Sequence, residues 1–168
     1  HLFSVSDDEI LKNAYDTNFK MSPPLREISD VKAVREALKS GLIDVIATDH
    51  APHHTDEKIV EFDKAPFGII GLQTLVPLTL KLVNEGVISL ERMVELTSTN
   101  AAKMLNLKDK GKLAEGMLAD IAVIDPEIEY VYDEKINRSK SINSPLFGKK
   151  LKGAATTTIK SGKIVYEF

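Results

Sequence analysis

The pattern of hydrophobic and polar positions along this chain changes near residue 108. Before that point, continuous apolar stretches alternate with amphipathic ones, which is typical of strands that alternate with helices. Residues 31–41 predict an amphipathic helix, which Ser29 or Asp30 can cap and Gly41 can end. Its apolar face would be formed by Val31, Val34, Ala37 and Leu38.

The segments on either side of this helix predict extended structure. Residues 17–26 (TNFKMSPPLR) form a short run that Pro23 and Pro24 stop, and Pro23 also disfavours helix at Ser22. Residues 42–49 (LIDVIATD) are almost continuously apolar. That character predicts a parallel strand buried on both faces.

Further helices are expected in the next sixty residues. Residues 72–86 predict a rather apolar helix, in which Pro77 either causes a kink or lies in the first turn. Two shorter helices are predicted at residues 89–99 and 100–107, and Ser89 can cap the first of them.

After residue 108 the apolar runs become short and are separated by glycine turns. Residues 160–163 (KSGK) lie between two strand-like runs and predict a hairpin. We therefore expect two domains, an α/β part at residues 1–108 and a small β module at residues 109–168.

The composition of the chain excludes several classes of protein. The chain has 168 residues, of which 43% are hydrophobic and 28% charged, as in a folded globular protein. A net charge of −3 gives no electrostatic reason to expect nucleic acid or a membrane surface as a partner. Cysteine is absent, which excludes thiolate chemistry and fits a cytoplasmic location. A start at His1 without methionine suggests a piece of a longer chain.

The strongest chemical signal lies at the exit of the predicted strand. Asp49 follows the apolar run, and three of the four histidines lie just behind it, at His50, His53 and His54. A carboxylate at the end of a parallel strand can ligate a metal, act as a general base or hold a loop. A cap or turn role is the plain alternative. One carboxylate with loop histidines is not a full zinc site, so other ligands would lie elsewhere.

Several ordered motifs resemble one family. Residues 44–58 (DVIATDHAPHHTDEK) are similar to a signature of bacterial dihydroorotases, which belong to the amidohydrolase superfamily. Residues 17–26, 64–78 (KAPFGIIGLQTLVPL) and 97–107 (TSTNAAKMLNL) resemble further segments of that family, and the last sixty residues resemble its returning β-strands. The resemblance implies the C-terminal part of a (β/α)8 metal-dependent hydrolase barrel plus the C-terminal part of a small β-sandwich.

The resemblance also implies roles for individual residues. Asp49 matches a zinc ligand that is also the general base, with most other ligands upstream of this chain. His53 matches a histidine that contacts the substrate, and Phe67 and Gly68 match a pair whose backbone contacts the substrate ring. For that pair, a core phenylalanine and a turn glycine are the alternative. Ser22 stands where the family usually has a substrate-contacting asparagine, so a bridging water, a lower affinity or another cyclic amide as substrate are the alternatives there.

The function implied for the parent protein is dihydroorotase. This enzyme interconverts dihydroorotate and N-carbamoyl-aspartate in de novo pyrimidine biosynthesis with Zn2+, as a cytoplasmic protein that forms a homo-oligomer. The isolated chain is expected to be inactive. Two alternatives stay open: a cyclic amidohydrolase of the hydantoinase or allantoinase type, and a non-catalytic relative that associates with aspartate transcarbamoylase. Roles for His50 and His54 do not follow from the resemblance.

Overall fold

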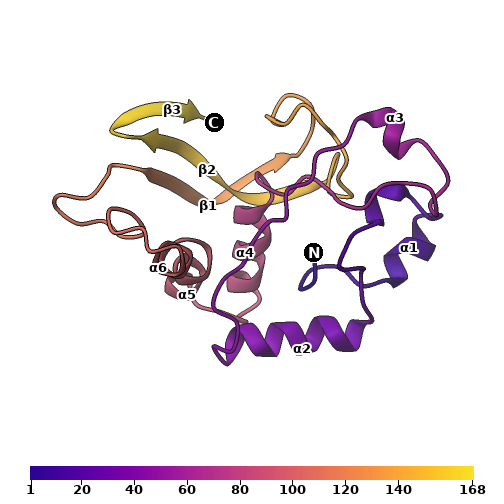
Figure 1. The fold of residues 1–168 in the computed structure, drawn as a ribbon, viewed down its shortest axis with the longest axis horizontal. Helices are drawn as coiled ribbons and strands as arrows, with labels where there is room; N and C mark the ends of the chain where they lie inside the picture. Colours follow the sequence, from indigo (N-terminus) through magenta and orange to yellow (C-terminus); the bar gives the residue numbers. More distant parts are fainter. The chain divides into compact units, whose positions relative to one another are not determined.

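All the helices lie in the first two thirds of the chain, where loops connect them, and the strands follow (Figure 1). The computed structural model describes all 168 residues. The helices are α1 (Asp8–Lys12), α2 (Ile28–Lys39), α3 (Thr55–Lys58), α4 (Leu75–Asn84), α5 (Leu90–Val94) and α6 (Asn100–Met104), with a 3-10 turn at Thr17–Phe19 and a π-helical segment at Glu95–Thr99. The strands are β1 (Ile121–Val131), β2 (Lys150–Lys160) and β3 (Lys163–Glu167).

The chain forms two compact units, each assembled from three separate segments. The first unit comprises His1–Ala37, Thr48–Leu75 and Val131–Lys150. The second comprises Leu38–Ala47, Val76–Tyr130 and Leu151–Phe168. All five residues predicted for the site belong to the first unit. The predicted boundary between residues 108 and 109 concerns the barrel and sandwich of a longer chain, and it stays a prediction.

The first unit has a small apolar core behind its N-terminal loops. Phe19, Met21 and Leu25 are buried together, and Val5, Ile10 and Ile69 pack against them. The expected extended run begins instead with the 3-10 turn, because the Asp16 side chain accepts a hydrogen bond from the amide of Asn18 and caps it.

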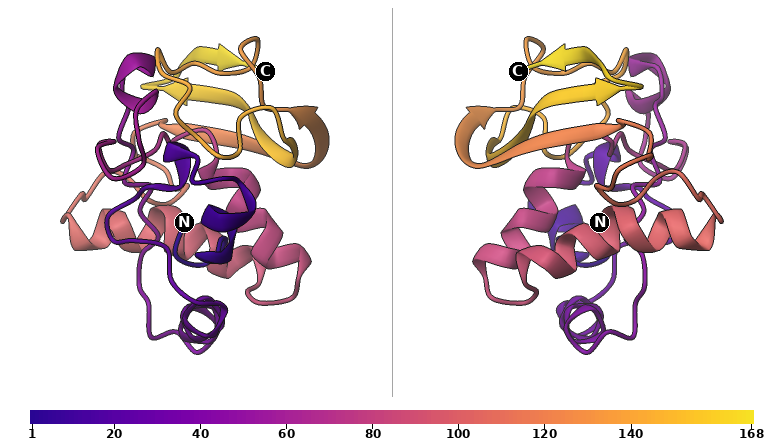
Figure 2. Two further views of the ribbon diagram at one scale, coloured as in Figure 1. Left: turned by 90° about the vertical axis from the view of Figure 1, so that its right-hand side faces the viewer. Right: turned by 90° about the vertical axis from the view of Figure 1, so that its left-hand side faces the viewer.

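The second unit contains a three-stranded sheet in which β2 lies between β1 and β3 (Figure 2). β2 and β3 are antiparallel, and their register pairs Lys160 with Lys163. The connecting residues Ser161 and Gly162 have φ angles of 49° and 79°. Two positive φ angles are what a type I′ hairpin turn requires, so the predicted hairpin is confirmed.

Helix α4 packs against β2 within this unit. A Cβ atom on Gly153 would collide with Cδ1 of Leu80, so the glycine permits the close approach of helix and strand. Leu80 and Leu82 of α4 are buried, and Pro77 lies in the first turn of the helix, as one of the two alternatives predicted. No helix of the structure is both long and apolar enough to span a membrane.

The other helices differ from prediction mainly at their ends. α2 begins at Ile28, ahead of the predicted caps Ser29 and Asp30, and it buries Val31 and Leu38 as expected. The two short helices predicted at residues 89–99 and 100–107 form a continuous run from Leu90 to Met104, because the π-helical segment joins them. Ser89 caps this run as predicted, by accepting a hydrogen bond from the amide of Arg92.

The strand predicted at residues 42–49 is absent, and that prediction was wrong for this chain. The segment is extended but irregular, and one of its few backbone hydrogen bonds runs from the amide of Ile46 to the carbonyl of Leu96. A parallel strand exists only when neighbouring strands satisfy its backbone groups on both sides. Within this chain the segment has no such neighbours, so its apolar sequence does not produce a strand.

Candidate active site

Asp49 lies at a sharp change of chain direction. Its φ of 48° falls in the left-handed region, which aspartate tolerates better than most residues. Directly after it, His50 pairs with Ile69 in an isolated parallel bridge, in which the amide of Ala51 donates to the carbonyl of Ile69 at 2.9 Å. The Asp49 carboxylate is exposed and makes no hydrogen bond within the chain. Both of its oxygens are therefore available to a ligand or a substrate.

His50 anchors this exit to the loop that precedes α4. Its Nδ1 accepts hydrogen bonds from the amides of Gly71 at 3.1 Å and Leu72 at 3.4 Å. Because an accepting ring nitrogen carries no proton, the neutral ring is protonated on Nε2. A Cβ on Gly71 would lie 2.8 Å from the carbonyl oxygen of Thr48, so the glycine is needed for this approach. His50 therefore positions the loop, the role that sequence reasoning left open.

His53 connects the strand exit to the Phe67–Gly68 loop. Its Nε2 lies 2.9 Å from the carbonyl oxygen of Phe67, and since a carbonyl only accepts, Nε2 donates the proton. Its Nδ1 lies 3.6 Å from a carboxylate oxygen of Glu57. The Nε2–H group of the His53 ring is thus already bonded to Phe67. That carbonyl retains a second lone pair for another donor.

The Phe67–Gly68 loop presents an exposed aromatic ring next to a constrained glycine. Phe67 is 57% exposed, so the alternative that it is a core residue is wrong. Lys20 holds the loop twice, through a hydrogen bond from the amide of Gly68 to its carbonyl at 3.0 Å and through its ammonium 4.8 Å from the Phe67 ring centroid. Gly68 has a φ of 115°, and a Cβ there would lie 2.5 Å from that of Ala51.

Ser22 lies apart from these contacts. It is exposed and stands between the buried residues Met21 and Leu25. It makes no hydrogen bond to the loops that carry Asp49, His53 and Phe67. A hydrogen bond therefore joins His53 to the Phe67–Gly68 loop, whereas Ser22 belongs to the same unit but makes no contact of this kind.

His54 has a structural role at the start of α3. Its ring accepts a hydrogen bond from the amide of Asp56, and its own amide donates to the side chain of Glu57 at 2.8 Å. This reciprocal arrangement is a capping box, which satisfies amides at the first turn of a helix.

Two residues that sequence reasoning missed hold the loops together. Asn143 is 4% exposed, and its side chain bonds to the backbone of Ala51, His53 and Gly68. Lys58 is 7% exposed, and its ammonium donates to the carbonyls of Thr17 at 3.0 Å and Pro66 at 2.8 Å. Burial lowers the pKa of the Lys58 ammonium, and the nearby charge of Lys20 acts in the same direction. The signal for either role is the burial of a polar side chain, which only the structure reveals.

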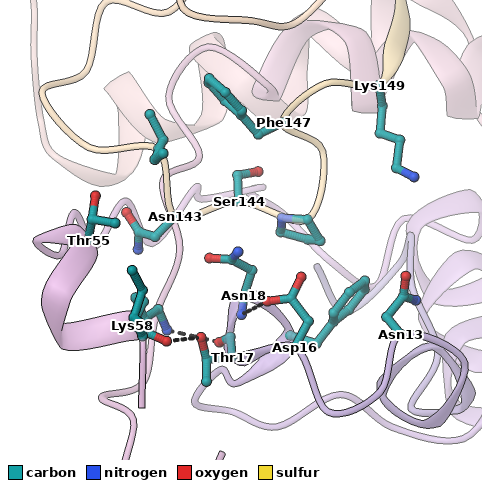
Figure 3. A pocket seen from close by; sticks show the side chains of 14 residues that line it. Asn13, Asp16, Thr17, Asn18, Thr55, Lys58, Asn143, Ser144, Phe147 and Lys149 are labelled. Carbon is teal, nitrogen blue, oxygen red and sulfur yellow. Dashed lines mark hydrogen bonds between the residues drawn. The ribbon is translucent and has the colours of Figure 1, made fainter.

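Lys58 and Asn143 also line a cavity of about 430 Å³ (Figure 3). Its other polar residues include Thr17, Asn18 and Ser144. None of the five predicted site residues lines it, so this cavity is distinct from the candidate active site. Figure 3 shows the paired hydrogen bonds between Lys58 and Thr17 that close one side of it.

The chain supplies at most part of a metal site. No group of three or more histidine, aspartate or glutamate side chains in it could hold a metal ion. The free carboxylate of Asp49 is suitable as a single zinc ligand, but a zinc site needs about four. The residues of this chain therefore do not form a zinc site by themselves.

Known proteins with similar sequences share one family. The model of the amidohydrolase family matches residues 13–165. The dihydroorotase of Geobacter metallireducens is 53% identical over 99% of this chain and 39% of its own length. That of Endomicrobium trichonymphae is 48% identical, with the same coverage of each chain. The present chain thus spans about two fifths of the length of these curated relatives.

Known structures agree with this grouping. L-hydantoinase from Arthrobacter aurescens matches with a TM-score of 0.86 and 30% identity over 99% of this chain and 38% of the hydantoinase. A D-hydantoinase matches with a TM-score of 0.82 and 31% identity over 95% of this chain and 36% of its own. The predicted fold class, a fragment of a hydrolase barrel, is confirmed. Since the family model covers most of the chain, the protein belongs to the amidohydrolase family.

Proposed function

We propose that the parent of this chain is a dihydroorotase. It would hydrolyse a ring amide of dihydroorotate to N-carbamoyl-aspartate and catalyse the reverse closure, as a step of pyrimidine biosynthesis. The observation that carries the proposal is the identity of 47–53% to dihydroorotases over 99% of the chain. The hydantoinases with similar structures are 26–31% identical.

Asp49 would act as the general base and as one metal ligand. When bound, a zinc ion would lower the pKa of a water molecule and polarise the substrate carbonyl. Asp49 itself would accept the proton of the attacking water and return it to the leaving ring nitrogen. Its exposed carboxylate, free of hydrogen bonds within the chain, supports both tasks. The remaining ligands would come from residues outside this chain.

The substrate would lie against the loops that His53 connects. His53 would hydrogen-bond the substrate carboxylate after exchanging its bond to Phe67 for one to the ligand. The Phe67 carbonyl, released from His53, and the exposed edge of this loop would contact the ring. Ser22, with a shorter side chain than asparagine, would reach the substrate through a water molecule.

The location, oligomeric state and partners of the parent protein are also proposals. We expect a cytoplasmic homo-oligomer that uses small-molecule substrates and binds neither nucleic acid nor membrane. An association with aspartate transcarbamoylase would fit an inactive relative and an active one alike. A cyclic amidohydrolase of the hydantoinase type is the second candidate, and the high TM-scores to hydantoinases are the observation in its favour.

The test is a hydrolysis assay with dihydroorotate, hydantoin and allantoin. It would use zinc and a form of the protein extended upstream to the length of its relatives. We expect turnover of dihydroorotate, reduced about 10²- to 10⁴-fold by Asp49→Ala, as is typical for loss of a general base. Asp56→Ala, which removes an exposed carboxylate from α3, is the matched control and should keep full activity.

Each other outcome points to a different function. Preference for hydantoin or allantoin would favour the second candidate. An extended form that is inactive on all three substrates but binds aspartate transcarbamoylase would identify a non-catalytic relative.

A further inference from the structure

The side chain of Asn143 makes three hydrogen bonds, all of them to the two loops of the candidate site. Its Nδ2 donates to the carbonyl of Ala51 at 2.9 Å and to that of Gly68 at 3.2 Å. Its Oδ1 accepts from the amide of His53 at 3.2 Å. Its backbone carbonyl also accepts from the amide of Ile70 at 3.0 Å. One buried residue thus bonds to residues 51–53 and to residues 68–70.

Few other side chains could make this set of bonds. Two carbonyls need donors and one amide needs an acceptor, and a short primary amide offers both. Aspartate would place a carboxylate against two carbonyl oxygens and supply no donor. Alanine would leave three part-buried backbone groups without these partners, which costs more than the net value of the bonds themselves.

The loops that Asn143 joins carry the predicted chemistry. Residues 51–53 follow Asp49 and end at His53, and residues 68–70 begin at Gly68, directly after Phe67. The imidazole of His53 already contacts the Phe67 carbonyl, so the two loops meet at a second point. The side-chain amide of Asn143 joins the same two loops through separate bonds, to Ala51 and His53 on one and to Gly68 on the other.

We propose that Asn143 is a positioning residue, which sets the separation and register of the two substrate loops without touching the substrate. Its effect on catalysis rests on the function proposed above, whereas its effect on loop order does not. Displacement of a reacting group by about 1 Å can cost on the order of 100-fold in rate. We call the three side-chain hydrogen bonds of Asn143 to the loops the clamp. Its loss should therefore reduce activity although every reacting side chain is kept.

The same segment offers a matched control. Asn137 is also an asparagine whose side-chain nitrogen donates and whose oxygen accepts, but its partners are Tyr132, Ser139 and Ser141, all within residues 131–150. Asn137→Ala therefore removes a comparable polar network without releasing either substrate loop. A difference between the two alanine variants isolates the clamp from general loss of stability.

The first measurement is steady-state hydrolysis of dihydroorotate by the extended protein and its variants. We expect Asn143→Ala and Asn143→Asp to lower kcat/KM about 10- to 100-fold, with part of the loss in kcat, and Asn137→Ala to stay within about threefold. The assay is run at temperatures where each variant is fully folded. Equal activity of the Asn143 and Asn137 variants would overturn the proposal.

The second measurement is hydrogen exchange, which does not depend on activity. In Asn143→Ala, peptides that cover residues 49–54 and 66–71 should lose protection, whereas Asn137→Ala should change mainly residues 136–142. An inactive wild type would refute the proposed function only, and the exchange data would still decide whether Asn143 orders the loops. Unchanged protection of both loops would overturn the inference.

Discussion

The candidate site and the three-stranded sheet are built in different ways. The sheet follows local rules: strand-like runs, a two-residue turn with positive φ at Ser161 and Gly162, and a glycine where α4 approaches β2. The site has almost no regular structure. Its loops are held by single side chains, Asn143, Lys58 and His50, that bond to distant backbone groups. Local sequence patterns therefore encode the sheet, while individual polar residues encode the site.

The largest effect is expected where the site loops depend on the buried ammonium of Lys58. Lys58→Met keeps most of the length of the side chain but leaves the carbonyls of Thr17 and Pro66 without donors, at a cost of roughly 2–3 kcal/mol in unfolding free energy. Chemical denaturation would measure the change. Lys64→Met, at an exposed lysine paired with Glu61, is the control and should change little.

The contribution of Lys58 to stability depends on pH. The folded-state pKa lies below the ordinary 10.5, so the unfolded chain binds more protons between the two values. The cost of the buried charge is fully present below the folded pKa and is relieved as the pH rises toward 10.5. The stability advantage of the wild type over Lys58→Met should therefore grow in that range. A pH-independent difference would contradict this.

The next effect tests the close approach of the loop to the strand exit. In Gly71→Ala the new methyl group would meet the carbonyl of Thr48, and we expect a loss of roughly 1–3 kcal/mol, as for other overpacked positions. Thermal unfolding would measure it, with the exposed neighbour Leu72→Ala as control. If both variants melt together, the two backbones are not held at this distance, and the site is looser than described.

In the sheet, a comparable change should cost less because only the backbone conformation is affected. Gly162 has a φ of 79° and open space around it, so Gly162→Ala should cost roughly 1 kcal/mol. Ser161→Gly at the neighbouring left-handed position is the matched variant and should not destabilise, because glycine adopts this conformation without the Cβ penalty. Equal unfolding free energies for wild type and Gly162→Ala would mean that the turn does not constrain the hairpin.

The smallest effect concerns the ion pairs beside that hairpin. Asp120 accepts hydrogen bonds from the ammonium groups of Lys110 and Lys160 and from the amide of Ser161, which together hold its pKa well below the usual range. The stabilisation is present above pH 3.8 and is lost as the pH falls through and below that value. The difference between wild type and Asp120→Asn should therefore vanish in acid and weaken with salt. A difference that persists at low pH would contradict it.

Elements with local sequence signals could be predicted, whereas the contacts that assemble the site could not. The helix at Ile28–Lys39, the first-turn position of Pro77 and the hairpin were predictable because their signals lie within a few residues. The strand expected at residues 42–49 failed because a parallel strand depends on neighbours that this chain does not contain. An apolar run alone cannot supply them.

Within the site, the sequence indicated which residues to consider but not what holds them. Asp49 and His53 were found because acidic and imidazole groups cluster after an apolar run. The joining of His53 to Phe67 could not be foreseen, since the two residues lie 14 positions apart in the sequence with the short helix α3 between them. Asn143 is 75 to 92 residues from its partners, and no periodic pattern reports a contact at such separation.

The position of Asn143 in the chain has a consequence for biosynthesis. A ribosome makes Asp49, His53, Phe67 and Gly68 well before residue 143, and contacts of such long sequence separation form late in folding. The backbone groups of the nascent loops therefore stay hydrated until residue 143 emerges from the ribosome. A product cut short before residue 143 would carry every reacting side chain predicted here but would lack the bonds that set the separation of the two loops.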